Sequence, residues 1–207
     1  MKVFFIYFLQ IFLSVSISIY AEPPKEEVKK SDSSEPQKQA EEQKEAMSLE
    51  DNALSSVKKM IGFIRYKKNN KAIEFVDTHQ FAKNLLKNHF DSLSSSDKKE
   101  FENALKEYII NKSFPIALKY FDKVDINYEK PVIKGEEAVI GSSVLYQGSE
   151  KVAFSWVLTE NNGKFLISDF ITEGKRVSEV NRTKQIEPMY KKKGIKEVIS
   201  ILKKISK

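Results

Sequence analysis

The 207-residue sequence contains no cysteine and only two histidines, one tryptophan, seven glycines and six prolines. The absence of cysteine excludes a disulfide framework, a thiolate metal site and a thiol nucleophile. Short catalytic motifs are missing as well, since no GxSxG, P-loop, GxGxxG or HExxH pattern occurs. The sequence therefore predicts a protein that is not an enzyme and that needs no metal and no cofactor.

The first segment, residues 1–21, has the pattern of a targeting signal. One lysine precedes a nearly unbroken apolar run from Val3 to Ile19, and small residues surround a cut after Ala21. The run has 17 residues, which is at the low end for a membrane span, so an uncleaved anchor stays open as the alternative. We expect a secretory signal peptide that is cleaved near Ala21.

The second segment, residues 22–48, has three prolines, mixed charge and almost no large apolar side chain. Such a composition buries too little surface to offset the entropy lost on ordering. We predict a disordered charged linker here and a folded domain over residues 49–207.

The folded domain begins with a helical pattern and then changes to a period of two. Apolar residues recur every three or four positions from Leu49 to Ile64, and a Ser/Asp cap opens the helix that carries Phe101 and Tyr108. After Asp122 four alternating segments follow, and Asn-Asn-Gly at 161–163 is typical of a hairpin turn.

The last segment returns to a helical period, with an apolar stripe from Ile195 to Ile205. The order of helices, strands and helices predicts an α+β fold. In it, N-terminal helices pack on a curved antiparallel sheet of about four strands, and two helices follow at the C-terminus.

Both faces of the predicted strands lack charge. In residues 152–159, large apolar side chains alternate with small neutral ones, whereas a half-exposed strand would place charges on its outer face. We therefore expect both faces to be shielded from water, with one of them bordering an apolar pocket. In the last strand, Asp169 interrupts an apolar face formed by Phe165, Ile167 and Ile171, and we interpret it as a structural hydrogen-bond anchor.

A set of residues in the C-terminal half resembles the MlaC (toluene-tolerance) family of transport components. The resemblance extends over roughly residues 50–206 and includes an aromatic pair on a strand, a strand end with Asp-x-x-x-Glu-Gly, a helical arginine and a Lys-Gly-Ile motif. The matching positions are Phe154, Trp156, Phe165, Asp169, Glu173, Gly174, Arg182, Gly194, Ile195 and Leu202. Two departures from the family pattern are Lys175-Arg176 before Val177-Ser178, and Pro188 within a helical segment.

The resemblance implies a periplasmic phospholipid carrier with a cone-shaped, nuclear-transport-factor-like fold and an apolar cavity for acyl chains. The implied partners are phospholipid, an inner-membrane ABC transporter complex with a membrane-anchored substrate-binding subunit, and an outer-membrane lipoprotein complex. The expected lipid-binding residues are Phe81, Leu85, Phe101, Leu105, Tyr108, Val144, Tyr146, Phe154, Trp156 and Leu158.

The net charge of +6 is concentrated at the C-terminus. Residues 49–174 hold 18 basic and 18 acidic side chains, whereas residues 175–207 hold 11 basic and 3 acidic ones. We expect this basic segment to dock onto a partner or a membrane, and we do not expect nucleic acid as a partner of an exported chain. The docking candidates are Arg176, Arg182, Lys191, Lys192 and Lys193.

Two alternatives stay open at this stage. One is an envelope adaptor that binds a partner protein through its basic C-terminal helices and has no ligand. The other is an enzyme of similar fold that pairs Asp169 with His79 or His89, although His89 lies on the apolar side of its predicted helix and is better interpreted as a core or rim residue.

Overall fold

The computed structural model describes residues 48–146 and 150–207. The predicted signal peptide and all of the predicted linker except Ser48 therefore lie outside the described residues. Among the helices of the described ranges, none is long and apolar enough to cross a bilayer.

The first helix, α1 (Leu49–Arg65), forms where the sequence pattern predicts it. The Ser48 hydroxyl accepts a hydrogen bond from the Asp51 backbone N–H, which caps the helix start. The buried side chains recur every three or four residues along one side of α1, whereas Leu49 at the start of the predicted stripe is exposed. They are Ala53, Ser56, Val57, Met60, Ile61 and Ile64.

Several shorter helices follow α1 and lead into the sheet. Ser94 caps α5 in the way that its Ser/Asp pattern predicts. A π-helical turn, η4, joins α5 to α6, and Pro115 stands in the first turn of α6, where a missing N–H is tolerated. The bounds of these elements are α2 (Asn69–Ala72), η3 (Ile73–Phe75), α3 (Thr78–Leu86), α4 (Asn88–Ser92), α5 (Ser95–Tyr108), η4 (Ile109–Ser113) and α6 (Phe114–Phe121).

The sheet has six antiparallel strands in the order β1-β3-β4-β5-β6, with β2 also paired to β3. The expected number of about four was too low. The segment predicted as one first strand is two, because Pro131 between them has no N–H for the ladder, and the two-residue β6 was not predicted. The strands are β1 (Ile126–Tyr128), β2 (Val132–Lys134), β3 (Glu137–Tyr146), β4 (Glu150–Asn161), β5 (Lys164–Thr172) and β6 (Lys175–Arg176).

The hairpin between β4 and β5 confirms the turn predicted from Asn-Asn-Gly. Its two loop residues, Asn162 and Gly163, have φ angles of 52° and 78°. Two consecutive positive φ angles are characteristic of a type I′ turn, whose twist matches that of the flanking strands. The predicted turn at Gly148-Ser149 lies outside the described residues.

A β-bulge changes the expected facing of side chains in β5. Val157 pairs with Asp169, but the next residue of β4, Leu158, pairs with Ile167, so Ser168 is an extra residue on β5. Residues that pair directly across strands share a face of the sheet. Asp169 is therefore on the opposite face from Ile167, and the prediction that it interrupts the Phe165–Ile167 face was wrong.

The C-terminal helices are α7 (Val177–Asn181), the π-helical turn η5 (Arg182–Ile186) and α8 (Glu187–Ile205). Pro188 fits because it stands in the first turn of α8. Gly194 has φ 73° and ψ 179°, a conformation that essentially only glycine adopts, and it divides α8 into two straight parts.

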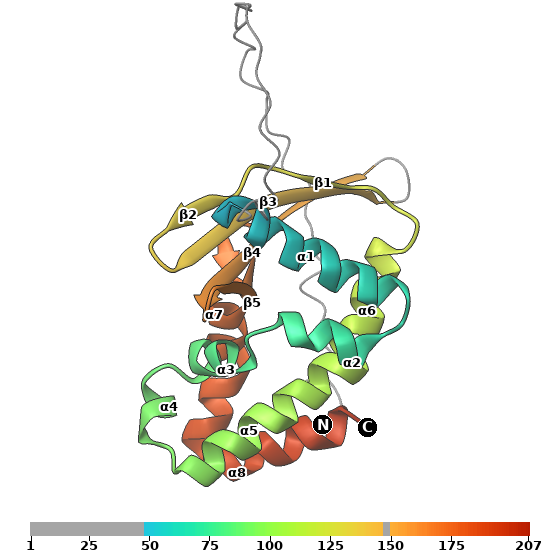
Figure 1. Ribbon diagram of the computed structural model, residues 1–207. Helices are drawn as coiled ribbons and strands as arrows, with labels where there is room; N and C mark the ends of the chain where they lie inside the picture. Colours follow the sequence, from blue (N-terminus) through green and yellow to red (C-terminus); the bar gives the residue numbers. More distant parts are fainter. Residues whose placement is uncertain (1–47, 147–149) are drawn as a thin grey trace, which may run out of the picture. The chain divides into compact units, whose positions relative to one another are not determined.

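The helices and the sheet form an α+β arrangement, as expected. Figure 1 shows α1 beside the sheet, α7 below β5, and α5 next to α8 at the end away from β1 and β2. Ion pairs join α5 to α8, since Lys196 contacts both Asp97 and Glu100, and Lys203 contacts Glu100. These pairs hold the second part of α8 against α5.

Candidate functional site

One face of the sheet carries large aromatic side chains. Ile140, Trp156 and Phe170 are direct neighbours across β3, β4 and β5, and Phe154 lies two residues before Trp156. The Trp156 ring is fully buried, and its centroid lies 4.6 Å from that of Phe170, 5.4 Å from Phe154 and 5.8 Å from Phe121 of α6. We call this side of the sheet the aromatic face.

A hydrogen bond within the core fixes the orientation of Trp156. The indole N–H donates to the Ser142 hydroxyl at 3.0 Å, and both residues are buried. Ser142 is the direct neighbour of Phe154 across the β3–β4 pair, so it belongs to the same face. The bond satisfies the only polar group of the tryptophan and leaves its ring to pack against apolar partners.

Helix α1 runs along the aromatic face and is tied at both ends. Near its start, the Asn52 amide donates to the Gly163 carbonyl oxygen at 3.0 Å. At its end, the Arg65 Nε donates to the Phe121 carbonyl oxygen at 2.9 Å. The start of α1 is therefore held by the β4–β5 hairpin, and its end is held by the end of α6.

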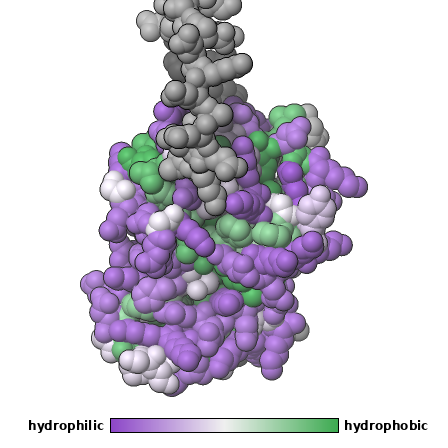
Figure 2. All heavy atoms as spheres, in the orientation of Figure 1, coloured by the Kyte–Doolittle hydropathy of each residue, from purple (hydrophilic) through white to green (hydrophobic). Residues whose placement is uncertain are grey.

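Apolar side chains also come close to the surface next to α1. Phe63 of α1 and Phe75 of η3 are both half-buried, and their ring centroids are 5.8 Å apart. In Figure 2, hydrophobic atoms reach the surface in several separate patches, some of them near the middle of the visible face, among hydrophilic atoms.

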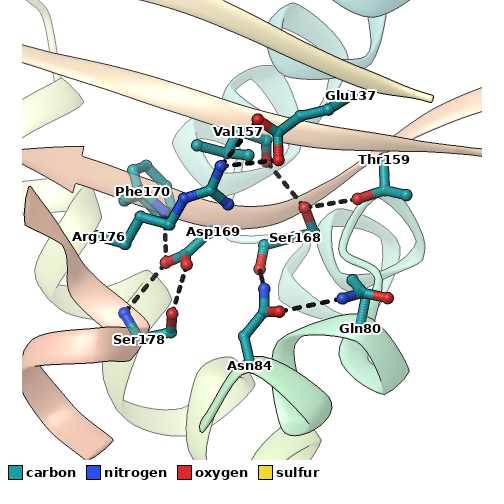
Figure 3. Close-up of polar contacts among 10 residues, drawn as sticks. All are labelled: Gln80, Asn84, Glu137, Val157, Thr159, Ser168, Asp169, Phe170, Arg176 and Ser178. Atoms are coloured by element: carbon teal, nitrogen blue, oxygen red, sulfur yellow. Dashed lines mark hydrogen bonds and ion pairs between the residues drawn. The ribbon is translucent and has the colours of Figure 1, made fainter. Parts of the chain in front are cut away.

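The opposite face of the sheet has small and polar side chains, and we call it the polar face. At its centre, Asp169 is buried and accepts hydrogen bonds from the backbone N–H groups of Phe170 and Ser178, at 2.8 and 3.1 Å, and from the Ser178 hydroxyl (Figure 3). The carboxyl group of Asp169 thereby anchors the start of α7 to β5, which confirms its interpretation as a structural anchor.

The environment of Asp169 raises the pKa of its carboxyl group above the ordinary value of 3.8. Burial is the main cause, because it penalises the charged form. The Ser178 hydroxyl, the two backbone N–H groups and the nearby Arg176 all lower the pKa, but by less in total.

The polar face continues into a network that includes helix α3. The Thr159 hydroxyl donates to the Ser168 hydroxyl at 2.8 Å, and the Asn84 amide of α3 donates to the Ser168 carbonyl oxygen at 3.3 Å (Figure 3). Arg176 pairs with both carboxylate oxygens of Glu137, at 2.7 and 2.8 Å. The bulge residue Ser168 is therefore held from both the sheet and a helix.

The polar face is less shielded than we expected. Ala153 is exposed, and Ser143 and Ser155 are half-buried. The absence of charge on this part of the face does not reflect burial, so the prediction that both faces are shielded was wrong there. Close to α7, by contrast, Val157 and Asp169 are fully buried.

The family model of the MlaC protein matches residues 49–204. The chain belongs to the MlaC protein family. This confirms the resemblance found in the sequence. No curated protein sequence matches the chain.

One solved structure agrees with the fold of this MlaC-family chain. A phospholipid-binding protein from Ralstonia solanacearum, solved in complex with a phospholipid, superposes with a TM-score of 0.62 at 14% identity, covering 75% of this chain and 97% of its own. A putative NTF2-like transpeptidase from Campylobacter jejuni gives a TM-score of 0.37 at 15% identity, covering 56% of this chain and 96% of its own. The first comparison confirms the α+β fold, and the second is too distant to support an argument.

The lipid-binding residues predicted for this MlaC-family chain are mostly core residues. Phe81 is half-buried, and the side chain of Tyr146 lies outside the described part of the chain. The others are at most 7% exposed: Leu85, Phe101, Leu105, Tyr108, Val144, Phe154, Trp156 and Leu158. Burial raises the pKa of the Tyr108 hydroxyl well above its ordinary value.

The predicted set comes from more than one layer. Val144, Phe154, Trp156 and Leu158 share the aromatic face by strand register. Phe81 and Leu85 belong to α3, and Phe101, Leu105 and Tyr108 belong to α5. Sequence reasoning missed Phe63, Phe75, Phe121 and Phe170. The eight-residue segment FPIALKYF, which ends at Phe121, is typical of a short helix or turn. No signal in one strand reveals the bulge that turns Phe170 toward Trp156.

The docking candidates are largely occupied by ion pairs. Arg176 pairs with Glu137, and Arg182 Nη1 lies 3.6 Å from Glu187. Lys191 pairs with Glu187 at 2.8 Å, and Lys193 pairs with Glu197 at 2.9 Å, each one helical turn away. Lys192 is exposed.

The two histidines have partners other than Asp169. His79 Nδ1 lies 2.8 Å from Glu102 Oε1, and the half-buried His89 stacks on Tyr190 with centroids 4.2 Å apart. His89 is therefore a rim residue, as predicted. In the described residues, no group of three or more His, Asp or Glu side chains is placed to hold a metal ion.

Proposed function

We propose that this protein is a periplasmic carrier that holds the acyl chains of a phospholipid against the aromatic face and moves lipid between the outer and inner membranes. The match of the MlaC family over residues 49–204 is the observation that carries the proposal. The phospholipid complex of the Ralstonia protein with the same fold supports it.

The physical requirement on such a carrier is apolar shielding. Moving one CH₂ group from water into an apolar environment is favourable by about 0.8 kcal/mol, so a dry apolar layer keeps the acyl chains of a bound lipid out of water. Trp156, Phe154 and Phe170 supply such a layer on the sheet, and Phe63 and Phe75 bring apolar side chains from the helices. No acid–base chemistry is needed, and we propose a carrier rather than an enzyme.

The proposed partners follow from membership of the MlaC family. We propose that the carrier exchanges lipid with an outer-membrane lipoprotein complex and with an inner-membrane ABC transporter complex that has a membrane-anchored substrate-binding subunit. We propose that one of these partners supplies the energy for lipid movement. The basic C-terminal segment, with Lys191, Lys192 and Lys193, would dock onto an acidic surface of these proteins.

The proposed location depends on the N-terminal segments. Residues 1–21 would direct export and be cleaved near Ala21, and residues 22–48 would link the mature N-terminus to the lipid-binding domain. The high content of charged residues in this linker would keep it solvated during passage between membranes.

A two-step transfer assay tests the proposal. The protein is incubated with donor vesicles that contain a labelled phospholipid, separated from them, and mixed with acceptor vesicles. We expect label to elute with the protein and then to appear in the acceptor vesicles. If the protein takes up no label and also contains no phospholipid from its source cells, the proposed function is wrong.

A further inference from the structure

The connection between α1 and α2 is the most strongly basic short segment outside the C-terminal region. Residues 65–71 read RYKKNNK, with four cationic side chains and no acidic one. In their midst, Tyr66 is 78% exposed, more than the other exposed large hydrophobic side chains of the described residues. We call residues 65–71 the basic loop.

The geometry of the basic loop keeps Tyr66 and its neighbours in solvent. The Lys67 N–H donates to the Ile64 carbonyl oxygen and the Lys68 N–H donates to that of Phe63, which is the Schellman pattern of a helix end. Lys67 takes the left-handed position of this motif with φ 56°, where glycine is usual. A lysine therefore occupies a position where a glycine would be less strained.

The charges of the basic loop are not neutralised within the described residues. Lys67, Lys68 and Lys71 are exposed and make no ion pair there, whereas Lys191 and Lys193 of α8 each pair with a glutamate. The Lys68 ammonium group lies 5.8 Å from the centroid of the Tyr66 ring. The loop thus combines an exposed aromatic ring with unpaired ammonium groups.

The surroundings of the basic loop reduce its positive charge but do not cancel it. Arg65 donates to the Phe121 and Val124 carbonyl oxygens, which brings the end of α6 next to the loop (Figure 1). Residues 122–125 add one lysine and two aspartates. With Arg65 and the three lysines of the loop, the combined surface remains positive.

We propose that the basic loop docks this protein onto an anionic lipid surface, with the Tyr66 ring in the headgroup layer and the lysines on lipid phosphates. The inference rests on the proposed function, since a lipid carrier must meet membranes. Tyrosine is favoured at the membrane interface because one end of its ring is apolar and the other polar, and nearby lysines bind anionic headgroups.

A lipid surface fits the loop better than an acidic protein does. A stable protein–protein interface buries about 800 Å² on each partner around an apolar centre. The basic loop, by contrast, has only seven residues, and its one apolar group is the Tyr66 ring, which flexible lysine side chains surround. Such a surface matches a fluid layer of phosphates, which adjusts to the positions of the lysines.

Vesicle flotation with the full chain tests the proposal. Vesicles of phosphatidylglycerol and phosphatidylcholine are compared with vesicles of phosphatidylcholine alone. Because the apolar residues 3–19 could bind any vesicle, the quantity measured is the preference for the anionic vesicles. We expect a clear preference that weakens as salt is raised.

Variants test whether the preference for anionic vesicles comes from the basic loop. The triple variant K67E/K68E/K71E should weaken binding to anionic vesicles by roughly a hundredfold, or about fivefold per lysine. The control K83E/K99E/K106E changes the net charge equally at three exposed lysines of α3 and α5 and should lose less than about fivefold. Tyr66→Ser should weaken binding in part, and Tyr66→Trp should keep it.

The outcomes separate this proposal from the proposed function. Mass spectrometry of the same preparations should find the same phospholipid content in the wild type and in both triple variants. If the wild type contains phospholipid but shows no anionic preference, or if the two triple variants lose binding equally, docking through the basic loop is wrong, and the loop then fits an acidic protein surface. If the wild type prefers anionic vesicles but neither contains nor takes up lipid, the proposed function is wrong and docking stands.

Discussion

The two faces of one sheet differ sharply, although the same three strands build both. On the aromatic face, Trp156 packs against three aromatic rings and makes its one hydrogen bond to Ser142. On the polar face, Asp169 accepts three hydrogen bonds and anchors α7. The comparison shows that the aromatic face is a packed apolar layer, on which we propose that lipid binds, and that the polar face holds a helix in place.

The bulge at Ser168 makes this division possible. Without an extra residue on β5, the alternation of side chains would place Asp169 on the same face as Ile167 and Phe165. A carboxyl group would then lie among the apolar side chains that we propose for lipid binding. With the bulge, Phe170 pairs with Trp156 and Asp169 turns toward Ser178.

The largest expected effect concerns two adjacent residues of β5 that point to opposite faces. Phe170→Asp places a charge beside Trp156 and should lower the phospholipid content at least about tenfold, because an unpaired carboxylate next to acyl chains is strongly disfavoured. Ile171→Asp, the matched control, changes the polar face and should retain lipid. Quantitative lipid extraction from both proteins measures the difference. Equal losses would mean that the two faces do not differ in ligand binding.

The next effect concerns stability on the polar face. Asp169→Ala leaves the donors of Ser178 and Phe170 without an acceptor and should lower the free energy of unfolding by about 2–4 kcal/mol. Urea denaturation measures the change, and Asp169→Asn, which keeps one acceptor oxygen, should lose clearly less. If Asp169→Ala lowered the free energy of unfolding less than Asp169→Asn does, the anchoring role of Asp169 would be contradicted.

The hydrogen bond between Trp156 and Ser142 on the aromatic face should contribute less to stability than the hydrogen bonds of Asp169 on the polar face. Ser142→Ala removes the acceptor of the buried Trp156 N–H and should lower the free energy of unfolding by about 1 kcal/mol. Ser143→Ala, the control, changes a half-buried serine of the other face and should have almost no effect. The two variants are compared by urea denaturation, and a similar loss in both would remove the special role of Ser142.

The smallest expected effect is a dependence of the unfolding free energy on pH, which arises from Asp169 on the polar face. The pKa of Asp169 is raised in the folded protein, so its contribution to stability is fully present below its ordinary pKa of 3.8 and is lost as the pH rises through the folded value. Asp169→Asn does not titrate. The unfolding free energy of the wild type relative to this variant should therefore fall as the pH rises over that range, and a rise would reverse the assigned sign.

Sequence patterns predicted the elements that depend on local chemistry. The helical stripe of α1, the Ser/Asp cap of α5 and the Asn162-Gly163 turn all follow from residues that are close in sequence. The family match was also visible in the order of short motifs. Such features need no knowledge of the partner strand or helix.

Features that depend on pairing between distant segments were not predictable. The Ser168 bulge exists only in the register of β5 against β4, so Asp169 was assigned to the same face as Phe165 and Ile167, which is incorrect. Likewise, the ion pairs of Lys191 and Lys193 reduce the free charge of a segment that looked strongly basic in sequence. The basic loop was overlooked because residues 49–174 are neutral in total.

The most direct test of the account is the phospholipid-to-protein ratio of purified wild type, Phe170→Asp and Ile171→Asp, measured by mass spectrometry after denaturing extraction. We predict bound phospholipid in the wild type and in Ile171→Asp, and at least about tenfold less in Phe170→Asp. A wild-type protein that contains no phospholipid and takes up none from vesicles would contradict lipid binding on the aromatic face, and so would a Phe170→Asp protein that is folded and fully loaded.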